Sequence, residues 1–125
     1  MSYLVDTQIF LWWLSDDQRL LHKTRELITS PEYEFYLSAA SIWEISIKSS
    51  LGKLAKIKDV CSLAEEEGFV LLPVLPLHAE LVNTLALHHK DPFDRLLIAQ
   101  AKSLKLRFLT ADKMLKNYGN FVVMA

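Results

Sequence analysis

Apolar residues in this chain fall into short runs separated by longer stretches in which they recur every three or four positions. Short apolar runs bounded by turn residues are typical of buried strands, and the longer spacing is typical of amphipathic helices. The pattern predicts strands at Ser2–Asp6, Glu34–Leu37, Phe69–Leu72, Arg107–Leu109 and Phe121–Met124. It predicts helices at Gln8–Leu14, from Asp16 or Asp17 to Thr29, and at Ser38–Leu51, Asp59–Glu67, Pro76–His88, Pro92–Leu104 and Asp112–Asn117. This alternation indicates an α/β fold with a central, mainly parallel sheet of about five short strands flanked by helices.

Two of the predicted helices carry clear start signals. Asp91 precedes Pro92, and an acceptor side chain followed by proline at the first helical position is typical of a helix N-terminus. Ser38 precedes the helical pattern that stops before Gly52. We therefore expect Asp91 to act as a helix cap and not as part of a functional site.

No linker-like stretch, repeat or low-complexity segment divides the sequence. Its 125 residues are enough to bury one core, so we predict a single domain over residues 1–125. The hydrophobic content of 51% and charged content of 23% are typical of a globular protein. The net charge of −1 gives no overall basic field, so a polyanionic partner would need a local patch or a bound metal ion.

The sequence shows no pattern that would direct the chain to a membrane or out of the cell. Its one cysteine, Cys61, excludes an internal disulfide and fits a reducing compartment. Asp6 interrupts the apolar start, which argues against a cleavable signal. The apolar run Ile9–Leu14 is far shorter than the ~20 residues of a membrane helix. We expect a cytoplasmic protein with no membrane association.

Four carboxylates stand at the ends of predicted elements. Asp6 and Asp112 directly follow predicted strands, whereas Glu44 and Asp94 lie near the beginnings of predicted helices. The carboxyl ends of parallel strands meet at one edge of a sheet, so all four can share that edge. Like charges placed together raise one another's pKa, and a hard divalent cation with oxygen ligands would relieve that cost.

Taken singly, three of these acids have an ordinary structural explanation. Asp6 and Asp112 could each hydrogen-bond a turn or cap the helix that follows. Glu44 stands four residues before Lys48, the favourable order for a helical ion pair. However, apolar residues fill most of the circumference of the Glu44 helix, which would bury the carboxylate and require a partner for it. Both interpretations of Glu44 remain open.

Asp94 is the most informative of the four. As the third helical residue after Asp91 it could belong to a capping box, but that motif normally uses Glu or Gln. It also lies in line with Ile98 and Ala101, which would turn its side chain toward the sheet at the helix mouth. This position favours a functional site over a cap.

The segments around these acids resemble the motifs of PIN-domain proteins, and specifically of the VapC-type ribonuclease toxins of toxin–antitoxin modules. The matching segments are Leu4–Leu14, Ser38–Lys48 with Leu51–Leu54, His88–Ala101 and Leu109–Asp112. They cover essentially the whole chain in the family's order. The segment Asp91–Ala101, DPFDRLLIAQA, is the most specific. Gln8 stands where the family more often has histidine, so whether position 8 contacts substrate stays open.

The resemblance implies a PIN-like domain that hydrolyses RNA phosphodiesters with Mg²⁺ or Mn²⁺. Residue by residue, it makes Asp6, Glu44, Asp94 and Asp112 the catalytic acids. We expect Asp6 and Asp94 to be the main metal ligands, and Glu44 and Asp112 to complete the cluster directly or through water. The family also implies an RNA substrate, a small cognate antitoxin, a homodimer, and operator DNA bound only through the antitoxin complex.

Three further residues are candidates for contact with substrate. Thr7 could orient Asp6 or a phosphate, or could simply begin the helix. Lys48 and Arg95 could contact the RNA backbone, or could be surface charges or partners of nearby acids. The four histidines show no metal-ligand spacing, and we treat them as surface or structural residues: His22, His78, His88 and His89. The three tryptophans are interpreted as core or interface residues: Trp12, Trp13 and Trp43.

Other functions fit the sequence less well. A phosphatase with an aspartyl nucleophile usually has a second Asp where this chain has Gln8, and a receiver domain needs paired early acids and a late lysine. The isolated glycines form neither a Walker loop nor a dinucleotide-binding fingerprint. Two alternatives remain: a catalytically silent PIN-like binding module, and a metal-dependent nuclease that acts on DNA.

Overall fold

The computed structural model describes residues 2–125, and every strand pairing within them is parallel. The five strands have the order β3-β2-β1-β4-β5. Their bounds are β1 (Ser2–Val5), β2 (Glu34–Ser38), β3 (Val70–Leu72), β4 (Arg107–Thr110) and β5 (Val122–Met124). The predicted α/β class and parallel sheet are therefore confirmed.

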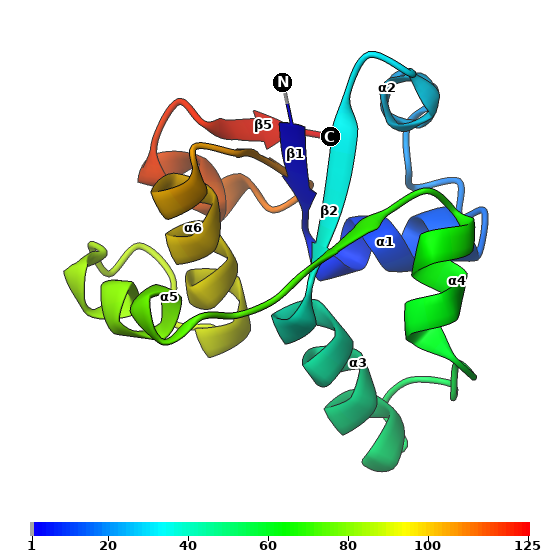
Figure 1. Cartoon of the computed structure of the whole chain (residues 1–125), viewed down its shortest axis with the longest axis horizontal. Helices are drawn as coiled ribbons and strands as arrows, with labels where there is room; N and C mark the ends of the chain where they lie inside the picture. The colour runs from blue at the N-terminus through cyan, green and yellow to red at the C-terminus, as the bar shows by residue number, and fades with distance from the viewer. Residues whose placement is uncertain (1) are drawn as a thin grey trace.

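Helices connect the strands and cover both faces of the sheet (Figure 1). Their bounds are α1 (Thr7–Leu14), α2 (His22–Thr29), α3 (Ala39–Ser50), α4 (Val60–Glu66), α5 (Pro76–Leu81), α6 (Pro92–Leu104), and the 3₁₀ helices η1 (Val82–Thr84) and η2 (Lys113–Tyr118). In Figure 1, α5 and α6 lie on one side of β1, and α1, α2 and α4 lie on the other. Within residues 2–125, no helix combines the length and apolarity needed to cross a bilayer.

The side chains of β1 divide between two hydrophobic clusters because successive residues of a strand point to opposite faces. Tyr3 and Val5 pack with Ile9 and Phe10 of α1, whereas Leu4 packs with the buried face of α6. Burial on both faces explains why the three buried residues of this strand, Tyr3, Leu4 and Val5, are all aromatic or apolar. Asp6, the first polar residue after β1, therefore lies at the edge of the sheet.

Two predicted helices have different bounds in the structure. The helix expected from Asp16 or Asp17 begins at His22, because the preceding residues form a turn in which Asp16 has φ 53° and the Asp17 carboxylate binds Arg19. The helix expected to reach His88 ends at Leu81 and continues only as η1. Carbonyl groups beyond that point accept hydrogen bonds from a side chain of α6 instead of from a helical backbone.

Both expected helix caps are present. Asp91 accepts hydrogen bonds from the N–H groups of Phe93 (2.8 Å) and Asp94 (3.1 Å), and α6 begins at Pro92 as predicted. Ser38 accepts one from the N–H of Ala40 at 3.0 Å. These caps fix the first turns of α3 and α6, the two helices that carry Glu44 and Asp94.

A buried polar group joins the start of α3 to a later turn of α6. Gln100 of α6 is fully buried, and its Oε1 accepts a hydrogen bond from the Ser38 hydroxyl at 2.5 Å. Its Nε2 donates to the carbonyl of Pro73 at 3.1 Å and lies 3.2 Å from Nδ1 of His78. The side chain of Gln100 therefore links α3, α6 and the segment after β3.

We predict that Ser38→Ala lowers the free energy of unfolding by about 1–3 kcal/mol, because it removes the cap of α3 and leaves the buried Gln100 oxygen unpaired. Ser46→Ala is the matched control, since this exposed hydroxyl of the same helix only bonds its own helix at the carbonyl of Ile42. The control should change stability by less than about 0.5 kcal/mol. Urea unfolding of both variants measures the difference, and equal losses would contradict the linking role.

Candidate metal and catalytic site

The four acids singled out from the sequence line one pocket of about 330 Å³. Asp6 follows β1 and Asp112 follows β4, so both lie at the carboxyl edge of the sheet. Glu44 and Asp94 reach the same pocket from α3 and α6. The fold thus brings together the four side chains that the sequence analysis grouped.

Asp6 is a buried carboxylate that is fixed from two sides. Its N–H donates to the carbonyl of Leu109 at 2.9 Å, and its Oδ2 accepts a hydrogen bond from the Thr110 hydroxyl at 2.6 Å. Burial raises the pKa of Asp6 to about 6, against the lowering effect of the Thr110 hydrogen bond. The charges of Glu44 and Asp112 raise it further.

Asp94 lies in the first turn of α6, directed toward the same pocket. Burial, followed by the charges of Asp6 and Asp91, raises the pKa of Asp94 to about 7. A hydrogen bond with His89 acts in the opposite direction. The raised values at Asp6 and Asp94 show that negative charge in this pocket is costly without a cation.

The carboxylate of Glu44 is only 5% exposed and has one satisfied oxygen. Its Oε2 lies 2.7 Å from the Lys48 ammonium, so the ion pair considered from the sequence is present. Its Oε1 is buried, and no residue between 2 and 125 gives it a hydrogen bond. An unpaired buried acceptor is rare and costly, so this oxygen calls for a ligand.

Asp112 has two roles, one for each oxygen. Its Oδ1 accepts a hydrogen bond from the N–H of Met114 at 2.9 Å and caps η2. Its Oδ2 lies 3.4 Å from Nε2 of His89. The cap and the site, which the sequence presented as alternatives for this residue, coexist in the structure.

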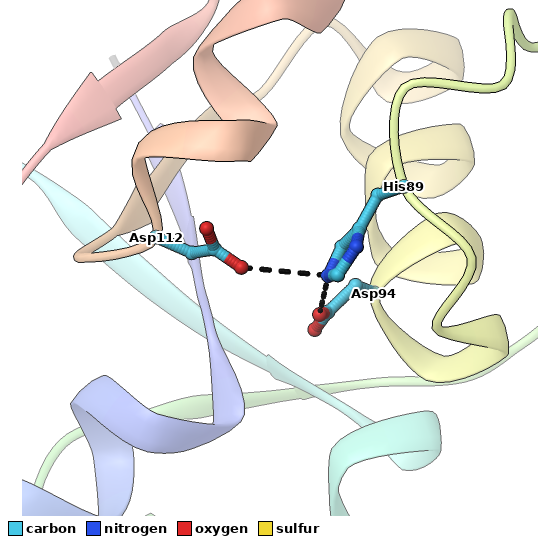
Figure 2. A group of neighbouring side chains, drawn as sticks. All are labelled: His89, Asp94 and Asp112. Atoms are coloured by element: carbon cyan, nitrogen blue, oxygen red, sulfur yellow. Dashed lines mark hydrogen bonds and ion pairs between the residues drawn. The ribbon is translucent and has the colours of Figure 1, made fainter.

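His89 is the site residue that the sequence analysis missed. Its Nε2 lies 2.9 Å from Oδ2 of Asp94, and Figure 2 shows the ring directed toward both Asp94 and Asp112. One potential ligand atom from each of these three residues lies within 4.8 Å of the other two. His89, which we treated as a surface or structural residue, is thus a partly buried neighbour of two of the four acids. Its place two residues before the cap Asp91 was the available signal, since a loop entering α6 must pass the edge of the sheet.

The side chains of this pocket fit a divalent cation. They offer carboxylate oxygens, one of them buried without a partner within residues 2–125, and the imidazole of His89 lies beside two of these acids. Oxygen ligands of this kind suit Mg²⁺ and Mn²⁺. The expected ranking, with Asp6 and Asp94 as main ligands and Glu44 and Asp112 as support, stays a prediction.

The candidate substrate residues have different surroundings. The Thr7 hydroxyl donates to Ser41 at 2.8 Å and ties α1 to α3, in agreement with the helix-starting alternative. Lys48 lines the pocket with its side chain 48% exposed. Arg95 uses its guanidinium on the carbonyls of nearby loops, so Lys48 is the better placed of the two for a phosphate. Gln8 also lines the pocket, and its role stays open.

The remaining histidines and Trp43 can also be placed. His78 is buried and accepts a hydrogen bond from the N–H of Leu75, as expected for a structural residue, and His88 packs its ring edge-on against Tyr118. Trp43 is 59% exposed, and its ring packs edge-to-face on Phe93 with the two ring centroids 5.3 Å apart. Trp43 is therefore not a core residue, and its assignment to an interface stays a prediction.

We predict that Asp94→Asn stabilises the metal-free protein increasingly as pH rises. The raised folded-state pKa means that the protonated form contributes stability below about pH 4, and that this contribution is lost as pH rises through about 7. The variant has no such loss, so its Tm minus that of the wild type should increase between about pH 5 and pH 8. Thermal unfolding in a chelating buffer measures this difference.

Asp17→Asn is the control for this experiment. The hydrogen bond from the Arg19 side chain lowers the pKa of Asp17 to about 2, so its contribution is lost only in more acidic solution. Its Tm difference should stay constant over the same range. A constant difference for Asp94→Asn as well would contradict the electrostatic description of the pocket.

Comparisons with known proteins agree with this architecture. A chain in the crystal structure of VapBC2 from Rickettsia felis bound to a promoter DNA fragment has a TM-score of 0.68 and 11% identity, covering 100% of this chain and 98% of that one. A chain in VapBC-1 from nontypeable Haemophilus influenzae has a TM-score of 0.67 and 18% identity, with coverages of 100% and 97%. A chain in a toxin–antitoxin complex from Klebsiella pneumoniae has a TM-score of 0.66 and 17% identity, covering 98% of this chain and 95% of that one. At these identities the likeness shows the fold.

No curated protein sequence matches the chain. The family model of the PIN domain matches residues 3–120, which include β2, β3, β4 and all of β1 except Ser2, and β5 follows the matched region. The match also spans the four acids and His89. The chain belongs to the PIN-domain family.

Proposed function

We propose that this chain is a divalent-metal-dependent ribonuclease, cutting within RNA, and that it acts as the toxin of a toxin–antitoxin pair. The observation that carries the proposal is the convergence of Asp6, Glu44, Asp94 and Asp112 in one pocket of a PIN fold. The raised pKa values of Asp6 and Asp94 and the unpaired Glu44 oxygen support a cation as the missing partner. All four acids are present, so nothing in the site favours a silent binding module.

In this proposal Asp6 and Asp94 hold Mg²⁺ or Mn²⁺, and Glu44 and Asp112 complete the cluster directly or through water. The cation supplies Lewis acidity and charge neutralisation at the attacked phosphate. In this proposal either Glu44 or Asp112 takes a proton from the attacking water. Lys48, at the mouth of the same pocket, provides a positive charge for the RNA backbone.

RNA is preferred over DNA as the substrate because the sequence motifs resemble those of ribonuclease toxins. A cation held by these acids would act on the phosphate, which RNA and DNA share. Cleavage of DNA is therefore the second candidate. Cytoplasmic localisation, where RNA is available, stays part of the proposal.

A second pocket supports a protein partner. It has a volume of about 690 Å³ and shares Gln8, Leu11, Trp12 and Leu54 with the acidic pocket. Several of its other residues are apolar: Leu14, Ala55, Ile57 and Leu63. The similar structures include complexes of toxins with antitoxins, one of them on promoter DNA. We propose that a small antitoxin covers this region and that operator DNA is bound only through the resulting complex.

We also propose a homodimer, as the family resemblance implies. Exposed apolar side chains on and near α5 could form such an interface: Leu75, Leu77 and Leu87. Trp43 adds an exposed aromatic ring on α3.

We predict that Asp6→Asn and Asp94→Asn each reduce metal-dependent RNA cleavage at least about 100-fold, because the loss of a ligand removes several kcal/mol of charge stabilisation. Asp59→Asn is the control, because Asp59 is exposed and its φ of 54° is a conformation that Asn tolerates. This variant should cleave RNA at the rate of the wild type. Excess EDTA should stop cleavage by the wild type. A gel assay with matched RNA and DNA strands measures the rates. Full activity of both acid variants would refute the site, and faster cleavage of DNA would favour the second candidate.

We further predict that expression of the chain alone arrests bacterial growth and that Asp94→Asn relieves the arrest. The reason is that toxicity would depend on the pocket and not on the presence of the protein. Colony counts after induction, at equal protein levels, measure the effect. A small antitoxin-like reading frame beside the gene should restore growth when co-expressed. Equal arrest by both forms would indicate a non-enzymatic action.

A further inference from the structure

The loop that carries His89 is held from both sides of its backbone. The N–H of His89 donates to the Tyr118 hydroxyl at 3.2 Å, and its carbonyl lies 3.4 Å from Nη1 of Arg95. The same guanidinium donates to the carbonyls of Ala86 (3.1 Å) and Val82 (3.2 Å) and to the Tyr118 hydroxyl (3.0 Å). These contacts fix the backbone at His89 without help from a ligand.

The imidazole that this loop presents has the spacing of a metal ligand. Its Nε2 lies 2.9 Å from Oδ2 of Asp94 and 3.4 Å from Oδ2 of Asp112, as Figure 2 shows. Neighbouring ligands around an ion with bonds of about 2.1 Å lie roughly 3 Å apart when the bonds are perpendicular. The three side chains are each partly buried and come from three different segments.

An independent observation indicates that this pocket holds a cation. Glu44 is more than nine-tenths buried, its Oε1 has no partner within residues 2–125, and it lines the same pocket as Asp94 and Asp112. Lys48 already pairs with the other oxygen of Glu44. The Oε1 atom of Glu44 therefore still lacks a partner within residues 2–125, because Lys48 binds the other oxygen and His89 contacts Asp94 and Asp112.

We propose that His89 supplies a nitrogen ligand to the metal site, together with Asp94 and Asp112, and that the site therefore prefers a first-row transition ion to Mg²⁺. Mg²⁺ takes oxygen ligands and keeps its waters, whereas imidazole is a common ligand of transition ions. The inference rests on the proposed function only in that the pocket binds a divalent cation. It adds His89 to the four acids as a metal ligand, and it says which kind of divalent ion the site prefers.

Pulsed electron paramagnetic resonance of the full chain with one equivalent of Mn²⁺ tests this inference without any substitution. A coordinated imidazole gives a ¹⁴N coupling, and this coupling should change to that of ¹⁵N when the protein is made with ¹⁵N-labelled histidine. His89→Gln should abolish the coupling, whereas His88→Gln, which changes the neighbouring histidine on Tyr118, should keep it.

Calorimetric titrations give the second measurement. His89→Gln should weaken Mn²⁺ binding at least about tenfold while changing Mg²⁺ binding much less, and His88→Gln should change neither. Stoichiometric Mn²⁺ binding by the wild type without any nitrogen coupling would overturn the inference and leave His89 as a counter-charge for the acids. That result would not affect the proposed function. Absence of any divalent-ion binding by the wild type would overturn both.

Discussion

Repulsion among carboxylates buried at one edge of the sheet is the constraint around which this molecule is arranged. The charge of Asp6 raises the pKa of Asp94, the charges of Glu44 and Asp112 raise the pKa of Asp6, and one oxygen of Glu44 has no partner within residues 2–125. Folding can hold them there because β1 and the first turns of α3 and α6 are fixed by contacts that do not involve the acids' charge. The rest of the structure thus supplies the rigidity that an unfavourable cluster needs, and a cation would supply the compensating charge.

The work of building the site is divided among neighbouring residues. Asp91 satisfies the free N–H groups at the start of α6, which leaves the Asp94 carboxylate available to the pocket. Lys48 occupies one oxygen of Glu44 and leaves the other without a partner. Asp112 divides its two oxygens between the cap of η2 and the pocket. Asp112 and Glu44 thus each use one oxygen in a bond within the fold and keep the other for the pocket, and the cap Asp91 also lines that pocket.

The sequence was sufficient for the sheet, the Asp91 cap and the grouping of the acids, because those depend on local patterns and on the geometry of parallel strands. It failed where a distant side chain decides the backbone. The early end of α5 and the course of the following loop depend on carbonyl groups bound by Arg95, which no local spacing reveals. His89 was missed for the same reason, since that loop gives it its position. Trp43 was assigned from a helical pattern that could not show which face of α3 lacks a neighbour.

The 3₁₀ helix η2 touches His89 at both of its ends. Asp112, its cap, faces the imidazole, and Tyr118, its last residue, holds the backbone N–H of the same histidine. A residue added or removed between these two would shift one contact relative to the other, so the length of this segment is fixed.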